Sequence, residues 1–303
     1  MSKMLSIAVF LALFLFGGGS LASATGYGFG LNPAFYSPTS PAPARAPNWH
    51  PPMNVQDACD TDNDTFLAGE KITYKLYYNW NFVWLSAGEV VFQVNELPEF
   101  YHITVTGTTY ESYEWFYKVR DRYESYIDKE TLLPAIHIKD VQEGGYLRYD
   151  RTTFDQIDHK AVSARGRTRD DLKSETIDFD GCMHDLISTM YWARNLKYED
   201  MQVNQEIPIK IMMDRKIYPL QVKYLGARKG TDVKGVGQFN TREFSPQLIA
   251  GDVFKEGDEM KIFVTDDQNK IPVLIESPVV VGSVKAVLHK YEGLMYPVTA
   301  KVK

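Results

Sequence analysis

Apolar and polar residues alternate with a period of two through much of the chain after residue 66. In the segment 71–78 the apolar side chains Ile72, Tyr74, Leu76 and Tyr78 fall on one face, and polar side chains occupy most of the other. Such alternation is typical of an antiparallel strand covered on one side. The pattern recurs in short segments without the intervening helices that parallel strands require. The sequence therefore predicts a mainly β fold of antiparallel strands.

The expected strands fall into two groups, one on each side of a single helical segment. Besides 71–78 and the segments around Val90 and Ile103, they are 116–127, 134–140, 146–154, 161–165, 207–213, 217–225, 233–244, 259–264, 272–276 and 281–289. No short internal repeat of solenoid or propeller type occurs. We expect one or more strongly curved antiparallel sheets, or a half-open barrel.

One segment departs from the β pattern and predicts a helix near residues 183–196. Its stripe side chains stand three, four or seven positions apart: Met183, Leu186, Ile187, Met190, Tyr191 and Arg194. Asp180 is expected to cap the N-terminus of this helix, and Asn195 to end it. We expect the helix to pack on the β surface.

The N-terminal 60 residues have a different character. Residues 1–24 resemble a secretory signal peptide, with Lys3, an apolar run, and Ala22-Ser23-Ala24 as a small-residue cleavage site. Residues 25–60 hold seven prolines and are expected to form a flexible leader. Residues 61–303 are expected to form a single β domain, with two β halves flanking the helix as the alternative. No later run is long and apolar enough to predict a transmembrane segment in the mature chain. We expect a periplasmic protein, with secretion as the alternative.

Charge and cysteine content narrow the possible partners. The net charge of −6 gives no electrostatic reason to bind nucleic acid. The two cysteines, Cys59 and Cys182, are expected to form a disulfide in an oxidising compartment; two separate buried thiols are the alternative. The six histidines form no metal-binding motif, so no metal site and no cofactor are expected.

The sequence assigns no catalytic residue. It contains no nucleophile elbow and no cofactor fingerprint, which favours a protein without enzymatic activity. Paired carboxylates for glycan hydrolysis leave no sequence signature, and Asp121, Asp185, Asp266 and Asp267 are the candidates. We nevertheless expect Asp266 and Asp267 to form a structural hairpin turn.

Large aromatic side chains supply the candidate ligand-binding site: Trp80, Trp84, Tyr113, Trp115 and Tyr117. If the segment holding the last three is extended, their shared parity places them on one face as a strip for acyl chains or sugars. The alternative is that these side chains fill the β core.

Four segments, taken in order, resemble the DUF3108 family of exported bacterial proteins. They are Gly69-Glu70 with Ala87-Gly88, Val119-Arg120-Asp121 with Leu133-Pro134, Asp185-Leu186-Ile187-Ser188 with Arg194, and Asp266 to Val273 with Gly282-Ser283-Val284-Lys285-Ala286. The resemblance spans about residues 66–290. It implies an envelope protein of diderm bacteria, similar to Bacteroidetes members, with a strongly curved antiparallel sheet. It carries over no catalytic residues, because the function of the family is not established.

Three functions are therefore in competition. The leading hypothesis is non-catalytic binding of an apolar or amphipathic ligand, or of an envelope partner, so that a lipid, a glycan or an envelope protein is the expected partner. The second is an envelope glycan hydrolase that uses paired carboxylates. The third is a structural or assembly protein whose proline-rich leader reaches a partner.

Overall fold

The structure is a computed structural model that describes residues 61–80, 83–115, 117–247, 259–279 and 282–303. Its main element is one antiparallel sheet in the order β8-β7-β6-β5-β4-β3-β2-β1-β14-β13-β12-β11-β10-β9. The strands before the helix are β1 Lys71–Trp80, β2 Val83–Glu96, β3 Phe100–Thr109, β4 Val119–Asp128, β5 Pro134–Glu143, β6 Tyr146–Asp155, β7 Lys160–Gly166 and β8 Lys173–Asp178. Those after it are β9 Glu206–Met213, β10 Lys216–Val233, β11 Gly237–Pro246, β12 Lys261–Thr265, β13 Pro272–Pro278 and β14 Ser283–Glu292.

Almost every strand pairs with its neighbours in the sequence. The exception is the pairing of β1 with β14, which joins the strands before the helix and those after it into one sheet. The two edge strands are β8 and β9, which flank the helical segment in the chain. The sheet therefore does not close into a barrel, and the predicted mainly β, antiparallel class is confirmed.

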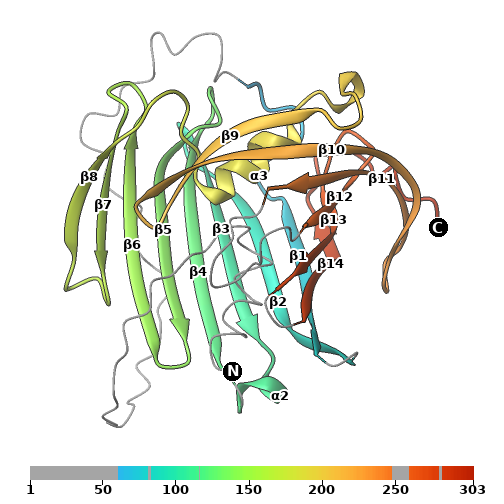
Figure 1. Cartoon of the computed structure of the whole chain (residues 1–303), viewed down its shortest axis with the longest axis horizontal. Helices are drawn as coiled ribbons and strands as arrows, with labels where there is room; N and C mark the ends of the chain where they lie inside the picture. The colour runs from blue at the N-terminus through green and yellow to red at the C-terminus, as the bar shows by residue number, and fades with distance from the viewer. Residues whose placement is uncertain (1–60, 81–82, 116, 248–258, 280–281) are drawn as a thin grey trace.

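The two ends of the sheet do not lie in one plane. Figure 1 shows β9 and β10 crossing in front of the long strands β3 to β6, with the helix α3 (Leu186–Arg194) enclosed between these two layers. Contacts of α3 with both β4 and β9 agree with this view. The helix thus lies inside the fold, covered by the sheet on two sides.

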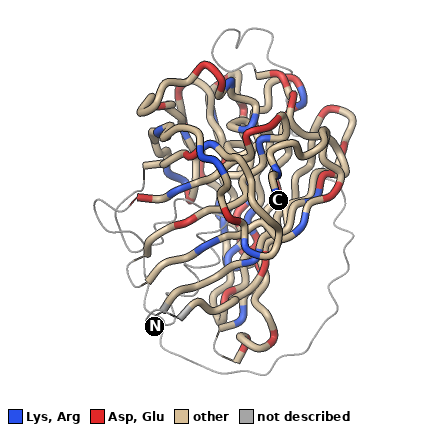
Figure 2. The backbone as a smooth tube through the Cα atoms, turned by 90° about the vertical axis from the view of Figure 1, so that its right-hand side faces the viewer, with Lys and Arg blue, Asp and Glu red and all other residues tan. Residues whose placement is uncertain are grey.

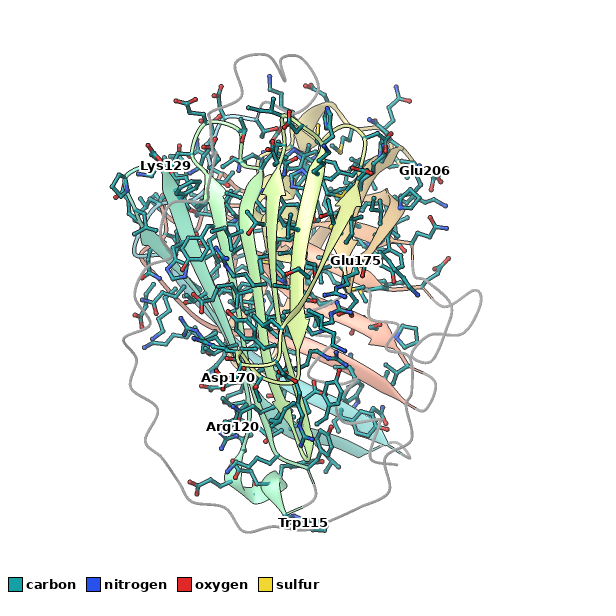
Figure 3. All side chains as sticks on the ribbon, turned by 90° about the vertical axis from the view of Figure 1, so that its left-hand side faces the viewer. Trp115, Arg120, Lys129, Asp170, Glu175 and Glu206 are labelled. Atoms are coloured by element: carbon teal, nitrogen blue, oxygen red, sulfur yellow. The ribbon has the colours of Figure 1, made fainter. Side chains whose placement is uncertain are left out.

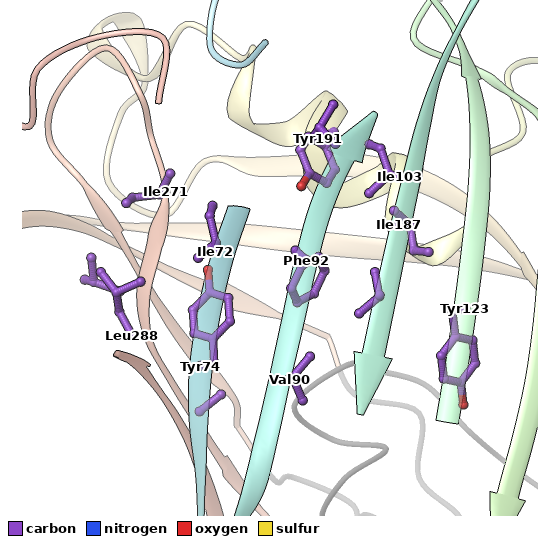
Figure 4. Packing of buried hydrophobic residues seen from close by; sticks show 14 of the residues in the cluster. Ile72, Tyr74, Val90, Phe92, Ile103, Tyr123, Ile187, Tyr191, Ile271 and Leu288 are labelled. Atoms are coloured by element: carbon purple, nitrogen blue, oxygen red, sulfur yellow. The ribbon is translucent and has the colours of Figure 1, made fainter. Parts of the chain in front are cut away.

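The inner face of the sheet carries the main core. Because side chains alternate along a strand, Ile72 and Tyr74 of β1 and Phe92 of β2 point inward, toward Ile187 and Tyr191 of α3 (Figure 4). Burying one such side chain contributes about 1.5–3 kcal/mol. The inward side chains of the alternating segment 71–78 therefore form part of the surface on which the helix packs.

The predicted helix exists but begins later than expected. The N-cap of α3 is Asp185, whose carboxylate accepts hydrogen bonds from the backbone N–H groups of Ile187 and Ser188. The expected cap, Asp180, instead forms an exposed ion pair with Lys210 at 2.5 Å. The expected C-terminal residue, Asn195, is the C-cap.

The strand predictions differ from the structure in two places. Residues 217–225 and 233–244 do form two separate strands, but the first was predicted too short, because β10 continues to Val233 through two register shifts against β11, which begins at Gly237. The edge strand β8 was not predicted, because most of its residues are exposed and show no apolar alternation.

The remaining helical turns are short: α2 (Glu111–Glu114) and a 3-10 turn, η1 (Tyr198–Asp200). No helix among the described residues is long and apolar enough to cross a membrane. Acidic and basic positions are interspersed along the strands rather than gathered by sign (Figure 2).

Candidate functional site

A largely apolar cavity of about 140 Å³ lies between α3 and the strands of the second half of the sheet. The helix contributes Leu186, Met190, Trp192 and Ala193; β9 and β10 contribute Ile207, Ile209, Ile211, Leu220 and Val222; β11 to β13 contribute Phe244, Ile262, Val264 and Ile275; and Tyr74 and Phe92 come from β1 and β2. The size resembles that of an engineered cavity of about 150 Å³ that binds benzene. The cavity therefore suits a group of about six carbon atoms.

The strand register explains why this wall is apolar. In β9 the residues Ile207, Ile209 and Ile211 share one parity, so their side chains point to the same face of the sheet. Across the hairpin, Leu220 pairs with Ile209 and Val222 pairs with Ile207. These cross-strand pairs form a continuous apolar surface that faces α3.

Hydrogen bonds fix the N-terminal end of α3 to both layers. The Ser125 hydroxyl of β4 donates to the Asp185 carboxylate at 2.6 Å. On the other side, His184 forms a parallel bridge with Ile211 of β9. His184 is buried beside Trp192, and this burial lowers its pKa to about 3, so the imidazole is neutral. His184 and Asp185 thus position the N-terminal end of the helix between β4 and β9.

A buried ion pair fixes the other end of the helix. The Arg194 guanidinium donates to both carboxylate oxygens of Glu70, at 2.6 and 2.8 Å. It also donates to the backbone carbonyls of Thr65 and Asn269. Arg194 is 1% exposed and Glu70 is fully buried. The helix that lines the cavity is therefore held at both ends by buried polar contacts.

The predicted aromatic site does not coincide with this cavity. The side chain of Trp80 lies outside the described residues, and none of the other four predicted residues lines the cavity. Trp84 is 39% exposed, with the Lys285 ammonium 4.8 Å from its ring centroid.

The predicted aromatic strip is wrong in its geometry, because the segment is not extended. Tyr113 lies in the short helix α2, and Trp115 is its C-cap. Trp115 is 85% exposed, at the end of the molecule beyond α2 (Figure 3). Tyr113 and Tyr117 instead pack against a small core cluster that includes Tyr78. Period-two parity therefore does not place Tyr113, Trp115 and Tyr117 on one face.

Three of the four candidate hydrolytic carboxylates occupy structural positions. Asp185 caps α3, and Asp266 forms an ion pair with Arg242 at 2.7 Å. The Asp267 carboxylate accepts from Thr265 and from two backbone N–H groups, those of Asn269 and Ala300. These contacts support the prediction that the Asp266-Asp267 turn is structural.

The fourth candidate, Asp121, lies on β4 four residues before Ser125, or about 13 Å along the strand from the Asp185 contact. It is 3% exposed, and burial together with the neighbouring Glu143 carboxyl raises its pKa well above the usual range. The acidic neighbour of Asp121 is thus Glu143, which the sequence analysis did not consider. The structure does not bring Asp121 and Asp185 together as an acid–base pair.

The cysteine prediction concerns a residue outside the described part of the chain. Cys59 lies before residue 61, where the described residues begin, so its disulfide with Cys182 stays a prediction; no free cysteine occurs among the described residues. The signal peptide and the whole proline-rich leader, residues 25–60, lie outside the described residues as well. Among those that are described, no group of three or more His, Cys, Asp or Glu side chains is placed to hold a metal ion.

The sequence analysis missed the cavity itself. The alternating residues 207–213, which line the cavity, were predicted to form a strand. Alternation does not show which other element of the fold faces that strand. The apolar stripe on α3 was expected only to pack on the sheet. The small side chain of Ala193 leaves space beside the helix, but nothing in the sequence indicates this.

A family model described as a protein of unknown function, DUF3108, matches residues 73–289. Among solved structures, a β-barrel-like protein of the domain of unknown function DUF1849 from Brucella abortus is similar, with 12% identity, a TM-score of 0.53, and coverage of 77% of this chain and 100% of that chain. This likeness shows a shared fold alone. The Mycobacterium tuberculosis lipoprotein LppX is 10% identical, covering 76% of this chain and 90% of that chain, but its TM-score of 0.15 supports no comparison of folds. No curated protein sequence matches the chain.

Proposed function

The chain belongs to the DUF3108 family of proteins of unknown function, and we propose that this member binds an apolar or amphipathic small molecule in the cavity between α3 and strands β9 to β13. The observation that carries the proposal is an apolar cavity of benzene size between elements that are fixed by buried polar contacts. Binding needs no catalytic group, in keeping with the structural positions of Asp185, Asp266 and Asp267.

The energetic cost of the cavity supports a role for it. Protein interiors contain few voids larger than a water molecule. At roughly 24 cal/mol per Å³, an empty cavity of 140 Å³ costs about 3 kcal/mol relative to a filled core. One larger side chain in place of Ala193 would remove much of this cost. A ligand that fills the space recovers it on binding.

The volume also limits the affinity. Very small ligands gain at most about 1.5 kcal/mol per non-hydrogen atom. A group of about six carbons therefore gains at most about 9 kcal/mol, which corresponds to a dissociation constant of about 0.3 µM at best. The physiological ligand gains further affinity only from atoms outside the cavity.

Fluorobenzene is a suitable probe, because its size matches the cavity and its fluorine reports binding by NMR. We expect the full chain to broaden and shift the fluorobenzene signal. Ala193→Phe, which places a ring in the cavity, abolishes this effect; Ala193→Leu is the milder replacement if the first variant does not fold. Ala164→Phe on β7, a half-buried site away from the cavity, retains it. Equal binding by folded Ala193→Phe would show that the ligand binds elsewhere.

We further propose that the protein performs this binding in the periplasm, after removal of residues 1–24. The support is the sequence pattern of an export signal with a small-residue cleavage site. Fractionation of an expressing diderm bacterium, followed by N-terminal sequencing, tests this location. A mature N-terminus at Thr25 in the periplasmic fraction is expected, and an intact N-terminus in the cytoplasmic fraction contradicts the proposal.

A further inference from the structure

The lining of the cavity includes two positively charged side chains, Arg194 and Lys270, and no carboxylate. Arg194 is already neutralised, because Glu70 holds it through two hydrogen bonds. Two further donors of its guanidinium bind backbone carbonyls, so four of its five N–H groups are engaged. A ligand therefore gains little from Arg194.

Lys270 has fewer partners than Arg194 and no close counter-ion among the described residues. Its ammonium donates to the Leu196 carbonyl at 2.6 Å and lies 4.9 Å from the centroid of the Tyr198 ring. Among the described residues no carboxylate lies within 4.0 Å of it; Glu199 and Asp64 act on it only from longer range. An ammonium has three donors, and the structure accounts for one.

From this arrangement we infer that Lys270 makes the cavity selective for amphiphiles with an anionic head group, a carboxylate or a phosphate, on a tail of about six carbons in contact with α3 and β9. The inference rests on the proposed binding function and specifies its ligand. The tail fills the apolar space, and the head group accepts hydrogen bonds from the Lys270 ammonium at the partly exposed rim.

The placement of Lys270 is specific and costly. Its backbone has φ of 48°, in the left-handed region that few residues other than Gly and Asn adopt. The turn before it is held by Asn269, whose side-chain amide donates to the Tyr296 carbonyl at 2.9 Å. Partial burial lowers the pKa of Lys270, because its ammonium is incompletely hydrated and lacks a close counter-ion. A bound anion supplies that counter-ion.

Two probes with the same tail separate the head group from the apolar part. We would measure binding of 6,6,6-trifluorohexanoate and 6,6,6-trifluorohexan-1-ol to the full chain by fluorine NMR, with fluorobenzene as the reference. Lys270→Met removes the charge, and Lys270→Arg retains it. Lys285→Met is the matched control, because Lys285 also lies over an aromatic ring, that of Trp84, which is outside the cavity. Sodium acetate and inorganic phosphate test binding of the anion without a tail.

The wild type is expected to bind the hexanoate at least about tenfold more tightly than the alcohol, as for a charge-assisted hydrogen bond. Lys270→Met removes this preference and leaves alcohol binding unchanged, whereas Lys270→Arg and Lys285→Met preserve it. Equal binding of both probes by the wild type would overturn the inference and leave Lys270 with only its contacts to Leu196 and Tyr198. Acetate or phosphate that binds as tightly as the hexanoate would overturn it too, by showing a site for free anions. If fluorobenzene also fails to bind, the proposed function itself is wrong.

Discussion

Replacing Arg194 by methionine tests how strongly the buried ion pair holds α3 in the sheet. The variant leaves the Glu70 carboxylate fully buried without its cation, and the carbonyls of Thr65 and Asn269 without their donor. Removing one partner of a buried ion pair costs about 3–5 kcal/mol, because the remaining charge stays desolvated. Total stabilities are about 5–15 kcal/mol, so this loss is a large share.

Urea unfolding followed by circular dichroism measures the free energy of unfolding for Arg194→Met. The matched control is Arg167→Met, an exposed arginine on the turn after β7, where a change within about 0.5 kcal/mol is expected. The double variant Glu70→Gln with Arg194→Met should lose less than the sum of the single losses, by about 1–3 kcal/mol. A loss below about 1 kcal/mol for Arg194→Met would refute the reasoning, because it would mean that the pair is solvated or replaceable.

Three further predictions concern the helix α3, His184 just before it, and the disulfide between Cys59 and Cys182. Ile187→Ala should cost about 2–5 kcal/mol in the same unfolding assay, because the side chain is 2% exposed in the main core; a loss below about 0.5 kcal/mol would contradict its burial. Since burial lowers the pKa of His184 to about 3, the unfolded chain binds a proton below about pH 6.5 that the folded chain does not, and stability falls as the pH falls. Between pH 7 and pH 5 this loss in the free energy of unfolding amounts to about 2 kcal/mol, and it should disappear in His184→Asn. The same dependence of stability on pH in the variant and the wild type would show that His184 is protonated in the folded state. Thiol labelling of unreduced, denatured protein should find no reactive cysteine, whereas two labelled cysteines would refute the Cys59–Cys182 disulfide.

The parts of the fold that could be predicted are those where local pattern and tertiary environment agree. Residues 71–78 alternate because one face of β1 covers the core, so the period is visible in the sequence. The stripe with Ile187 and Tyr191 identified α3 for the same reason. Edge strand β8 has little buried surface, so its sequence carries no period and could not be recognised.

The candidate site was less predictable, because it depends on which elements face each other. Trp115 was selected for its ring, yet aromatic identity does not distinguish a buried side chain from one that is 85% exposed. Glu70 and Arg194 are 124 positions apart, and only the pairing of distant elements makes them partners. Lys270 resembles any lysine in a hairpin turn until the packing of Leu196 and Tyr198 against it is known.

Crystals of the protein soaked with 6-bromohexanoate would test the central claim most directly, because anomalous scattering locates the bromine without prior assumptions. The account predicts a bromine peak in the cavity, in contact with Ile209 and Leu220, and carboxylate density beside the Lys270 ammonium. An empty cavity, or a bromine peak only at the aromatic side chains Trp84 and Trp115, would contradict it.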